Sequence, residues 1–446
     1  MTTPRIVFYG DDFTGATDTL ANAAQAGLRT VLFLGVPTPA QLQRAGTLDC
    51  IGIAGAARAM SPAEMRAELG PVGRFFQGTG ARVLHYKTCS TFDSAPHVGS
   101  IGQAINTLRT FARNPFVPIV GGQPNLGRYC VFGNLFAAAG SGGTVYRIDR
   151  HPTMSRHPVT PMGEADLRQH LALQGLVNVA GVGYPAYARS SIDDQLVELL
   201  GSKPDAVLFD VAQASDLAPI GRAIWRQATR QPLLAVGPSS VVQALAAGWA
   251  DSENRNDTSY TSKASAMGSA VLAAARGPVL VLAGSLSPIT AQQVRQATSY
   301  TPLALDAARL TDAGYQAQTA AQAAALLRNG HSVLACTSSA EGIATAGVPA
   351  GSRALAEACG AWLARVLAAG PLRRVGIAGG DTSSLSVQAL DAWGLSYLQP
   401  VAPGLALCRL HSDVPTLDGM EIVLKGGQMG PPDLFERLLH GAASSA

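Results

Sequence analysis

Two adjacent carboxylates follow the first apolar run of the chain. Residues 6–9 read Ile-Val-Phe-Tyr, Gly10 ends the run, and Asp11 and Asp12 come next in the segment GDDFTGATD. A carboxylate just past a strand can bind Mg²⁺, accept a proton from a hydroxyl or hold sugar hydroxyls. The structural alternative is an aspartate that caps the following helix, for which one carboxylate would be enough. We therefore expect at least one of the pair to be functional.

A second polar cluster follows a later strand. The segment YKTCSTFDSAP (86–96) carries Lys87, Ser90 and Asp93 in one loop. Such a loop suits an anionic, hydroxylated small molecule, and the alternative is an ordinary polar turn that caps the next helix.

A third segment, residues 146–167, is rich in arginine, histidine and proline. Its candidate ligand-binding side chains are Arg147, Arg150, His151 and Arg156. Arginine offers a planar fork that can clamp a carboxylate. The histidines of this segment, His151 and His157, lack the helical spacing of zinc ligands, so we predict no metal site.

The last third of the chain contains three strand ends rich in glycine and small polar residues. A strand followed by such a turn and a helix can cradle a phosphate through its backbone N–H groups, and the alternative is a simple helix cap. Neither a Walker motif nor GxGxxG is present. The candidate residues are Ser285 and Ser287 in LAGSLSPIT (282–290), Gly379, Gly380, Asp381, Thr382 and Ser383 in VGIAGGDTSSLSVQAL (375–390), and Lys425, Gly426 and Gly427 in VLKGGQMGPPDLF (423–435).

Apolar strands alternate with helices along the chain, which predicts an α/β protein with largely parallel sheets flanked by helices. Among the helices, we expect 16–27, 61–69 with Ser61 as its N-cap, and 97–111. Residues 251–270 are polar and poor in large apolar side chains. They predict a linker between two domains, 1–250 and 271–446. Ligands of such sheets gather at the carboxyl ends of the strands, where all the segments above lie.

Composition narrows the function further. With 47% hydrophobic and 14% charged residues the chain is expected to be compact, and with a net charge of +3 and no basic tract it has no electrostatic footprint for nucleic acid. The six cysteines form no CxxC pair, and no apolar run is long enough for a membrane span. The first strand begins too early for a signal peptide to precede it. We expect a cytoplasmic protein without a membrane partner.

Seven ordered segments together resemble the four-carbon acid sugar kinase family. They are DDFTGATD, KTCSTFDSAPHVGSIG, GRYCVFGNLF, RIDRHPTMSRHPVTPM, AGSLSPIT, GGDTSS and LKGGQMG, and they span nearly the whole chain. The resemblance implies an N-terminal domain that binds the acid sugar, a C-terminal domain that binds ATP, and an active site in the cleft between them. Members phosphorylate the terminal hydroxyl of D-threonate, D-erythronate or 3-oxo-tetronates.

The resemblance also implies roles for the candidate residues. Asp12, with Asp11 beside it, would meet the reactive hydroxyl as the catalytic pair. Lys87, Ser90, Asp93 and the segment 147–156 would surround the carboxylate and hydroxyls of the substrate. The glycine-rich loops would contact ATP, with Mg²⁺ as the usual cation of phosphoryl transfer, and a homodimer is an assembly that the chain could form. The chain departs from the family where Asp381 replaces a frequent Glu and Met429 a frequent aromatic residue.

Two alternatives stay open from the sequence. An acid sugar dehydrogenase or aldolase would need a dinucleotide fingerprint or a Schiff-base lysine, neither of which is evident. A non-catalytic sensor of an acid sugar would bind the sugar without turning over ATP.

Overall fold

The computed structural model divides into two compact units, Met1–Met267 and Gly268–Ala446. It describes residues 3–140, 142–157, 159–188, 192–253, 272–284, 287–337 and 353–442. Most of the predicted linker, residues 254–270, lies outside the described residues. Both units combine helices with a mostly parallel sheet, which confirms the predicted fold class.

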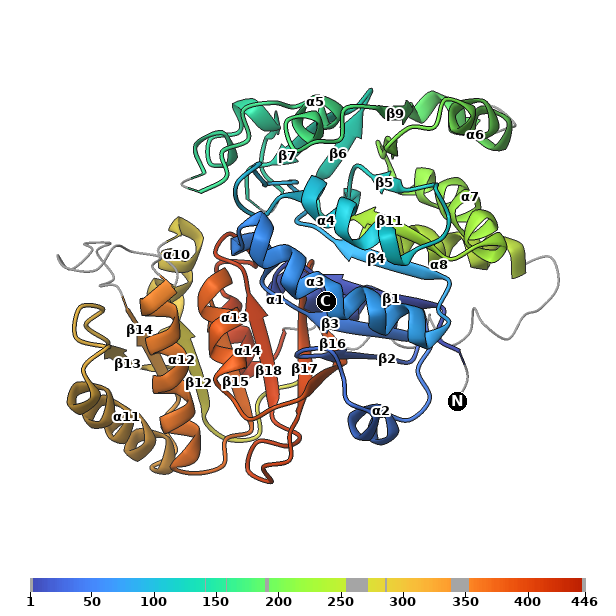
Figure 1. The fold of residues 1–446 in the computed structure, drawn as a ribbon. Helices are drawn as coiled ribbons and strands as arrows, with labels where there is room; N and C mark the ends of the chain where they lie inside the picture. The colour runs from blue at the N-terminus through green and yellow to red at the C-terminus, as the bar shows by residue number, and fades with distance from the viewer. Residues whose placement is uncertain are drawn as a thin grey trace. The chain divides into compact units, whose positions relative to one another are not determined.

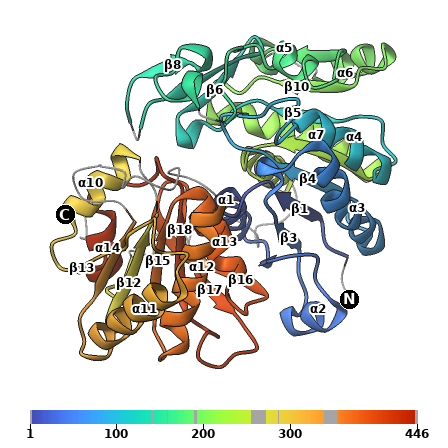
Figure 2. The ribbon, with the colours of Figure 1, turned by 60° about the vertical axis from the view of Figure 1, so that its left-hand side comes forward.

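The first unit is built on parallel strands in the order β2-β3-β1-β4-β11-β5-β10-β9 (Figures 1 and 2). All five residues of β1, β3, β4 and β11 are buried, because helices cover both faces of a parallel sheet. The strands are β1 (Ile6–Gly10), β2 (Thr30–Phe33), β3 (Cys50–Ala54), β4 (Val83–Lys87), β5 (Pro118–Val120), β9 (Val179–Val182), β10 (Ala206–Phe209) and β11 (Leu233–Gly237). The helices are α1 (Phe13–Gln25), α2 (Pro39–Ala45), α3 (Pro62–Thr79), α4 (Ile101–Leu108), α5 (Leu167–Ala172), α6 (Ile192–Gly201), α7 (Leu217–Arg230) and α8 (Ser240–Glu253).

Two helices differ from the sequence-based bounds. The cap at Ser61 is confirmed, since its side chain accepts from Glu64 N, but α3 continues to Thr79 instead of ending at residue 69. It passes through Pro71 because Val72 and Phe76 bury against the core beyond it. The helix predicted over 97–111 begins only at α4, where Ser100 is the cap.

A small antiparallel sheet stands apart from the main one. It consists of β6 (Arg128–Val131), β7 (Asn134–Ala138) and β8 (Val145–Arg147). The buried Asp210 carboxylate fixes the β6–β7 turn by accepting from Phe132 N at 2.6 Å and Gly133 N at 2.9 Å. This sheet leads directly into the arginine- and histidine-rich segment.

The second unit has the strand order β13-β14-β12-β15-β18-β17-β16. The first five strands are parallel, whereas β17 pairs antiparallel with both β18 and β16. The strands are β12 (Val279–Ala283), β13 (Thr301–Ala304), β14 (Val333–Cys336), β15 (Arg374–Ala378), β16 (Gly394–Ala402), β17 (Leu405–His411) and β18 (Glu421–Lys425). The helices are α10 (Pro288–Gln296), α11 (Ala313–Arg328), α12 (Arg353–Ala368), α13 (Gly380–Gln388) and α14 (Leu434–His440).

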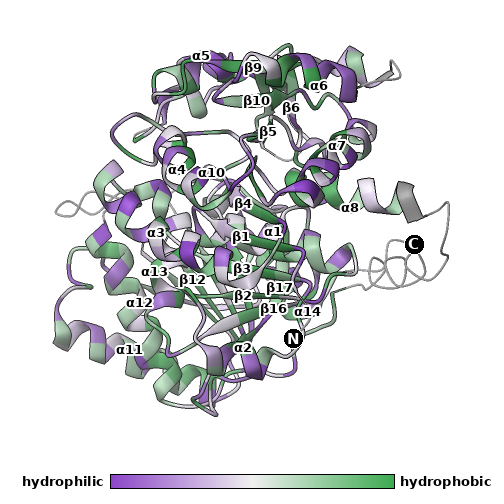
Figure 3. Ribbon diagram, turned by 45° about the vertical axis from the view of Figure 1, so that its right-hand side comes forward, coloured by the Kyte–Doolittle hydropathy of each residue, from purple (hydrophilic) through white to green (hydrophobic). Residues whose placement is uncertain are grey.

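Apolar residues concentrate in the strands of both units, while the helices contain both hydrophilic and hydrophobic residues (Figure 3). In the second unit, Leu434, Phe435 and Leu438 of α14 pack on the sheet face that presents Val279 and Val281. Among the described residues, no helix is long and apolar enough to cross a membrane.

Candidate active site

Strand register brings the polar loops of the first unit to one edge of its sheet. Gly10, the last residue of β1, is in register with Ala54 of β3 and with Lys87 of β4. Lys87 is in turn in register with Gly237 of β11. The segments that follow these four residues therefore start side by side at the carboxyl edge, where α/β proteins bind their ligands.

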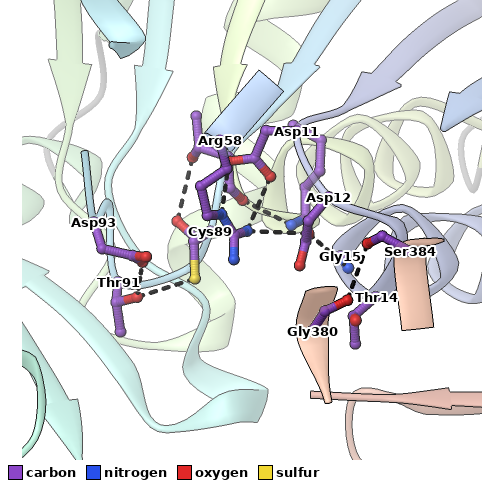
Figure 4. Close-up of polar contacts among 12 residues, drawn as sticks. Asp11, Asp12, Thr14, Gly15, Arg58, Cys89, Thr91, Asp93, Gly380 and Ser384 are labelled. Atoms are coloured by element: carbon purple, nitrogen blue, oxygen red, sulfur yellow. Dashed lines mark hydrogen bonds and ion pairs between the residues drawn. The ribbon is translucent and has the colours of Figure 1, made fainter. Parts of the chain in front are cut away.

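The two adjacent carboxylates are both held by Arg58. Its Nη2 lies 3.0 Å from Asp11 Oδ1 and its Nε donates to Asp11 Oδ2 at 3.3 Å, which makes a two-pronged pair (Figure 4). The same Nη2 lies 3.0 Å from Asp12 Oδ1. Asp11 is buried, whereas 17% of the Asp12 side chain is exposed.

Asp12 also caps α1. Its Oδ1 accepts from Gly15 N at 2.9 Å, so the structural and functional readings of the pair are compatible. Its other oxygen, Oδ2, has no hydrogen-bond partner among the residues that the structure describes. An oxygen in this state is available to a ligand.

Burial and the nearby positive charges have opposite effects on the pKa of the Asp11 carboxyl. Burial raises the pKa of Asp11, while Arg58 and Lys87 act against that rise. Asp11 and Asp12 together outweigh the effect of burial on Arg58 and raise the pKa of its guanidinium.

Lys87 lies beside the cap of α1. Its Nζ donates to Thr88 O at 2.7 Å, and Lys87 is buried. A Cβ added to Gly15 would lie 2.4 Å from Asp12 Oδ1 and 2.5 Å from Lys87 Nζ. Only glycine at this position leaves room for the carboxylate and the ammonium group together.

The loop after β4 is rigidly held. Thr91 Oγ1 donates to Asp93 Oδ1 and lies 3.0 Å from Cys89 Sγ (Figure 4). Between them, the buried Phe92 adopts φ of 54°, a left-handed conformation that non-glycine residues rarely take. Ser94 Oγ lies 2.9 Å from His170 Nε2 and accepts from Gln174 Nε2 at 2.8 Å, which ties the loop to α5 and the residues after it.

Asp93 is an ionised carboxylate despite its burial. Burial would raise its pKa, but Arg58 and the hydrogen bonds from Thr91 and Cys89 outweigh it and lower the pKa below the ordinary value. The charge of His157 acts in the same direction. Ser90, the other polar candidate in this loop, is half-buried.

The segment 147–156 divides into exposed and internally bound side chains. Arg147 donates from Nε to Asp149 Oδ1 at 2.7 Å, and Arg150 and Arg156 are exposed. His151 is buried, and its Nδ1 accepts from Thr153 N and Met154 N at 3.1 and 3.2 Å. Burial lowers its pKa, so His151 is neutral and shapes its own loop.

The second unit repeats the same arrangement at its own carboxyl edge. Ala283 of β12 is in register with Ala378 of β15, and Ala378 is in register with Lys425 of β18. The three glycine-rich segments predicted to bind a nucleotide therefore leave neighbouring strands side by side.

The amino end of α13 lacks a side-chain cap. Gly379 precedes the helix with φ of 130° and, as a glycine, offers no side chain to cap the first N–H groups. Ser383 N donates to Gly379 O at 2.8 Å, and Ser384 Oγ donates to Gly380 O at 3.0 Å (Figure 4). Asp381 lies in the first turn and Thr382 is buried. N–H groups at a helix start and the helix dipole favour negative charge, which is compatible with the phosphate-binding role predicted for this turn.

Close packing fixes that turn. A Cβ on Gly284, just after β12, would lie 2.3 Å from Thr382 Oγ1, so glycine is required there. Ser285 lies outside the described residues. Ser287 caps α10 by accepting from Thr290 N at 3.1 Å and donates to Gly427 O.

Lys425 is buried and uses its donors within the protein. Its Nζ donates to Thr290 Oγ1 at 2.8 Å and to Gly426 O and Gly427 O, each at 3.0 Å. Burial lowers the pKa of Lys425 to about 7. An ammonium group has three protons, so these three bonds occupy all of them.

Sequence reasoning missed two residues of the first unit. Arg58 stands alone in the alanine-rich segment AGAARAM (54–60), and no local pattern marks it. Asp18 belongs to the GDDFTGATD segment and is buried, where it accepts from Gln123 Nε2 at 3.0 Å and from Ser239 Oγ. It links α1 to the loops after β5 and β11.

Comparison with known proteins gives the family. A family model described as a sugar-binding N-terminal domain matches residues 6–245, and one described as a nucleotide-binding C-terminal domain matches residues 280–435. The chain is 38% identical over 463 residues to a 3-oxo-isoapionate kinase of Paraburkholderia graminis, covering 99% of this chain and 95% of that protein. It belongs to the four-carbon acid sugar kinase family. It is also 32% identical to a 3-oxo-tetronate kinase of Methylobacterium radiotolerans, over 96% of this chain and 97% of that protein.

Solved structures support the fold. A Salmonella typhimurium protein described as a putative tRNA synthase superposes with a TM-score of 0.77 at 22% identity, over 98% of both chains. A Haemophilus influenzae protein superposes with a TM-score of 0.70 at 24% identity, over 96% of this chain and 98% of that one.

The predicted function class is confirmed: this four-carbon acid sugar kinase is a nucleotide-dependent phosphotransferase. The comparisons do not favour a sensor, a dehydrogenase or an aldolase.

Proposed function

We propose that the chain transfers the γ-phosphoryl group of ATP to a hydroxyl of a 3-oxo sugar acid. The two relatives described above are named for 3-oxo acids, one for an isoapionate and one for a tetronate. Identity is higher to the former, so 3-oxo-isoapionate and 3-oxo-tetronate are the first substrates to compare.

The observation that supports this reaction is that the two adjacent carboxylates differ in how many of their oxygens are bound by Arg58. Both oxygens of Asp11 are engaged by Arg58, whereas Asp12 keeps Oδ2 for a ligand. In the proposed step, the substrate hydroxyl oxygen forms a bond to the γ-phosphorus and the bond to the β-γ bridging oxygen breaks. The hydroxyl proton passes to Asp12 Oδ2, and ADP leaves with the electron pair of the broken bond. Such a transfer asks for positioning and charge neutralisation more than for a strong base.

The substrate would be held by the remaining polar groups of the first unit. Lys87 supplies a positive charge beside Asp12, and the ionised Asp93 accepts from sugar hydroxyls. Ser90 and the arginines of 147–156 complete the set that surrounds the acid group.

The nucleotide would be held at the carboxyl edge of the second unit. The uncapped turn Gly379–Ser383 receives phosphate oxygens on its N–H groups, and Ser287 lies at the start of the neighbouring helix. Lys425 shapes the glycine turn through its bonds to Gly426 and Gly427.

Mg²⁺ would enter with ATP. The described residues contain no group of three or more histidine, cysteine or acidic side chains arranged to hold a metal ion. Mg²⁺ is usually held by one or two carboxylates together with substrate phosphates, and Asp381 in the first turn of α13 supplies such a carboxylate. The ion would neutralise charge on the transferred group.

The test is a coupled assay of ADP release with Mg²⁺, with each 3-oxo acid and with threonate and erythronate of both hands. We expect one acid to give turnover far above a no-acceptor control. Asp12→Asn keeps the helix cap, since asparagine caps as well as aspartate, but loses the proton acceptor. It should therefore lower kcat by about 10²–10⁴-fold with an unchanged melting temperature.

The matched control is Asp49→Asn, at the opposite edge of the same sheet, where Asp49 pairs with Arg29. It should leave kcat unchanged. If Asp12→Asn keeps turnover within a few-fold of the wild type, Asp12 is not the proton acceptor.

A further inference from the structure

Arg58 is the residue through which the carboxylates of the first unit are connected. It contacts Asp11 through two nitrogens and Asp12 through one, and its charge lowers the pKa of Asp93. Within the part of the chain that the structure describes, its Nη1 has no hydrogen-bond partner. The side chain is 26% exposed, so it is neither a surface arginine nor a fully enclosed one.

The loop that carries Arg58 is itself fixed against β1. Gly55 N donates to Gly10 O at 3.0 Å, and Arg58 N donates to Asp11 O at 3.1 Å. A Cβ on Gly55 would lie 1.9 Å from Tyr9 Oη, and one on Gly99 would lie 2.5 Å from Arg58 O. Backbone bonds and close packing on both sides therefore predetermine where the guanidinium lies.

We propose that Arg58 is a positioning residue that gives the two adjacent carboxylates different tasks. It occupies both oxygens of Asp11 and only Oδ1 of Asp12, and it thereby aims Asp12 Oδ2 at the reacting hydroxyl. This inference rests on the proposed role of Asp12. It adds a residue that neither the motif nor the comparisons assign.

Geometry explains why an arginine is needed. Two neighbouring carboxylates repel each other, and a lysine ammonium is a compact charge that cannot take both oxygens of one carboxylate and reach a second. The planar fork binds Asp11 with Nε and Nη2 and still presents Nη2 to Asp12.

Arg58 also affects the pKa of the carboxyl groups around it. The cluster brings the carboxyl groups of Asp11, Asp12 and Asp93 together with the basic side chains of Arg58 and Lys87. Without Arg58 the burial of Asp11 and Asp93 is opposed by less positive charge, so the pKa of both carboxyls rises. Among the described residues, the groups that face the cluster and titrate or carry charge are Tyr9, Tyr86, Lys87, Cys89, His157 and His170.

The experiment compares Arg58→Lys and Arg58→Gln with the wild type in pH profiles of kcat/KM for the acid. Arg58→Gln should move the acidic limb upward by about 1–2 pH units, because an opposite charge lowers a neighbouring carboxyl by about that much. Arg58→Lys keeps the charge but not the fork. Its acidic limb should stay near that of the wild type while kcat falls about 10²-fold, the cost of a misplaced catalytic group.

Arg29→Gln is the matched control. Arg29 also pairs with one aspartate through two nitrogens, but at the amino edge of the same sheet. It should change neither the acidic limb nor kcat. The KM for ATP should stay unchanged in all variants, since the change lies in the sugar-binding unit.

Each outcome decides. The inference is overturned if both Arg58 variants keep the acidic limb of the pH profile and the kcat of the wild type. It is also overturned if the variants differ from the wild type only in a lower melting temperature. If Arg58→Gln does not fold, Arg58→Lys carries the test, because a purely structural arginine would show no loss of kcat at full folding. Restoration of Arg58→Gln turnover by added guanidinium ion would support the positioning role. Failure of the proposed function is separate: there, Asp12→Asn itself stays active.

Discussion

Replacing Gly380 by alanine should strengthen the folded protein and weaken its binding of ATP. Gly380 is the first residue of α13, and a Cβ added there would meet no atom within 4 Å among the described residues. The protein alone therefore accommodates the methyl group. If a phosphate lies on the N–H groups of this turn, the methyl group occupies the space that the phosphate needs.

The two effects have different sizes and opposite signs. Alanine in place of a helical glycine stabilises by about 0.5–1 kcal/mol. In a unit of this size such a gain raises the melting temperature by about 1–4 °C. Loss of one charge-assisted hydrogen bond to phosphate costs about 1.5–3 kcal/mol, which is a rise in KM of about 10- to 150-fold.

The assay measures melting without ligand, and then KM for ATP and for the acid separately. Gly78→Ala is the matched control, because Gly78 lies near the end of α3 and its added Cβ also meets nothing within 4 Å. It should give a similar gain in melting temperature with no change in KM for ATP. A Gly380→Ala enzyme with wild-type KM for ATP would refute the placement of phosphate at this helix end.

Two further predictions concern the second unit. Gly284→Ala should raise KM for ATP and lower the melting temperature, because its Cβ would lie 2.3 Å from Thr382 Oγ1 and overpacking costs about 1–3 kcal/mol. The double variant with Thr382→Ala should recover part of the melting temperature. If it recovers none, the overlap with Thr382 is not the cause of the loss. Lys425 has its folded pKa lowered to about 7, so between about pH 7 and pH 10 the unfolded chain binds a proton that the folded chain lacks, and stability should rise with pH across that window. Lys425→Met should lose this rise in denaturant unfolding measured across the same pH range, and an equal slope in both proteins would contradict the assignment.

The fold class was predictable because its signal is local and repeated. Buried parallel strands read as continuous apolar runs, and β1, β3 and β11 all appear in the sequence as such runs. The antiparallel pair β16 and β17 was not predicted. Buried and half-buried residues do not alternate regularly along either strand, and the pairing slips between Tyr397 and Gln399, so no regular pattern marks it.

Helix ends were predicted correctly only where a recognisable capping residue marks them in the sequence. Ser61 followed by proline marked the start of α3 correctly. The helix predicted over 16–27 begins earlier, at Phe13, because Asp12 caps it by accepting from Gly15 N. The helix predicted over 61–69 continues to Thr79, because Val72 and Phe76 beyond Pro71 are buried in the core.

The candidate residues were found by motif, but the contacts that decide their tasks were not. His151 could be named from composition, yet only the structure shows that both its Nδ1 acceptor contacts lie within its own loop. Likewise Lys425 could be named as a cation of a glycine-rich turn. That its three protons go to Thr290 Oγ1 and two carbonyls follows from burial, which the sequence does not display.

Arg58 shows why sequence spacing alone could not complete the site. It is 47 residues from Asp11, and between them lie two α-helices, two strands and their loops. What brings them together is the strand order β3-β1-β4, which sets the end of β3 beside the end of β1 in register. Strand order depends on how the crossovers are wound, and this is a property of the whole sheet. A charged residue directly after a strand end is therefore a candidate in any parallel sheet, and it becomes a site residue only when its strand adjoins the one that carries the motif.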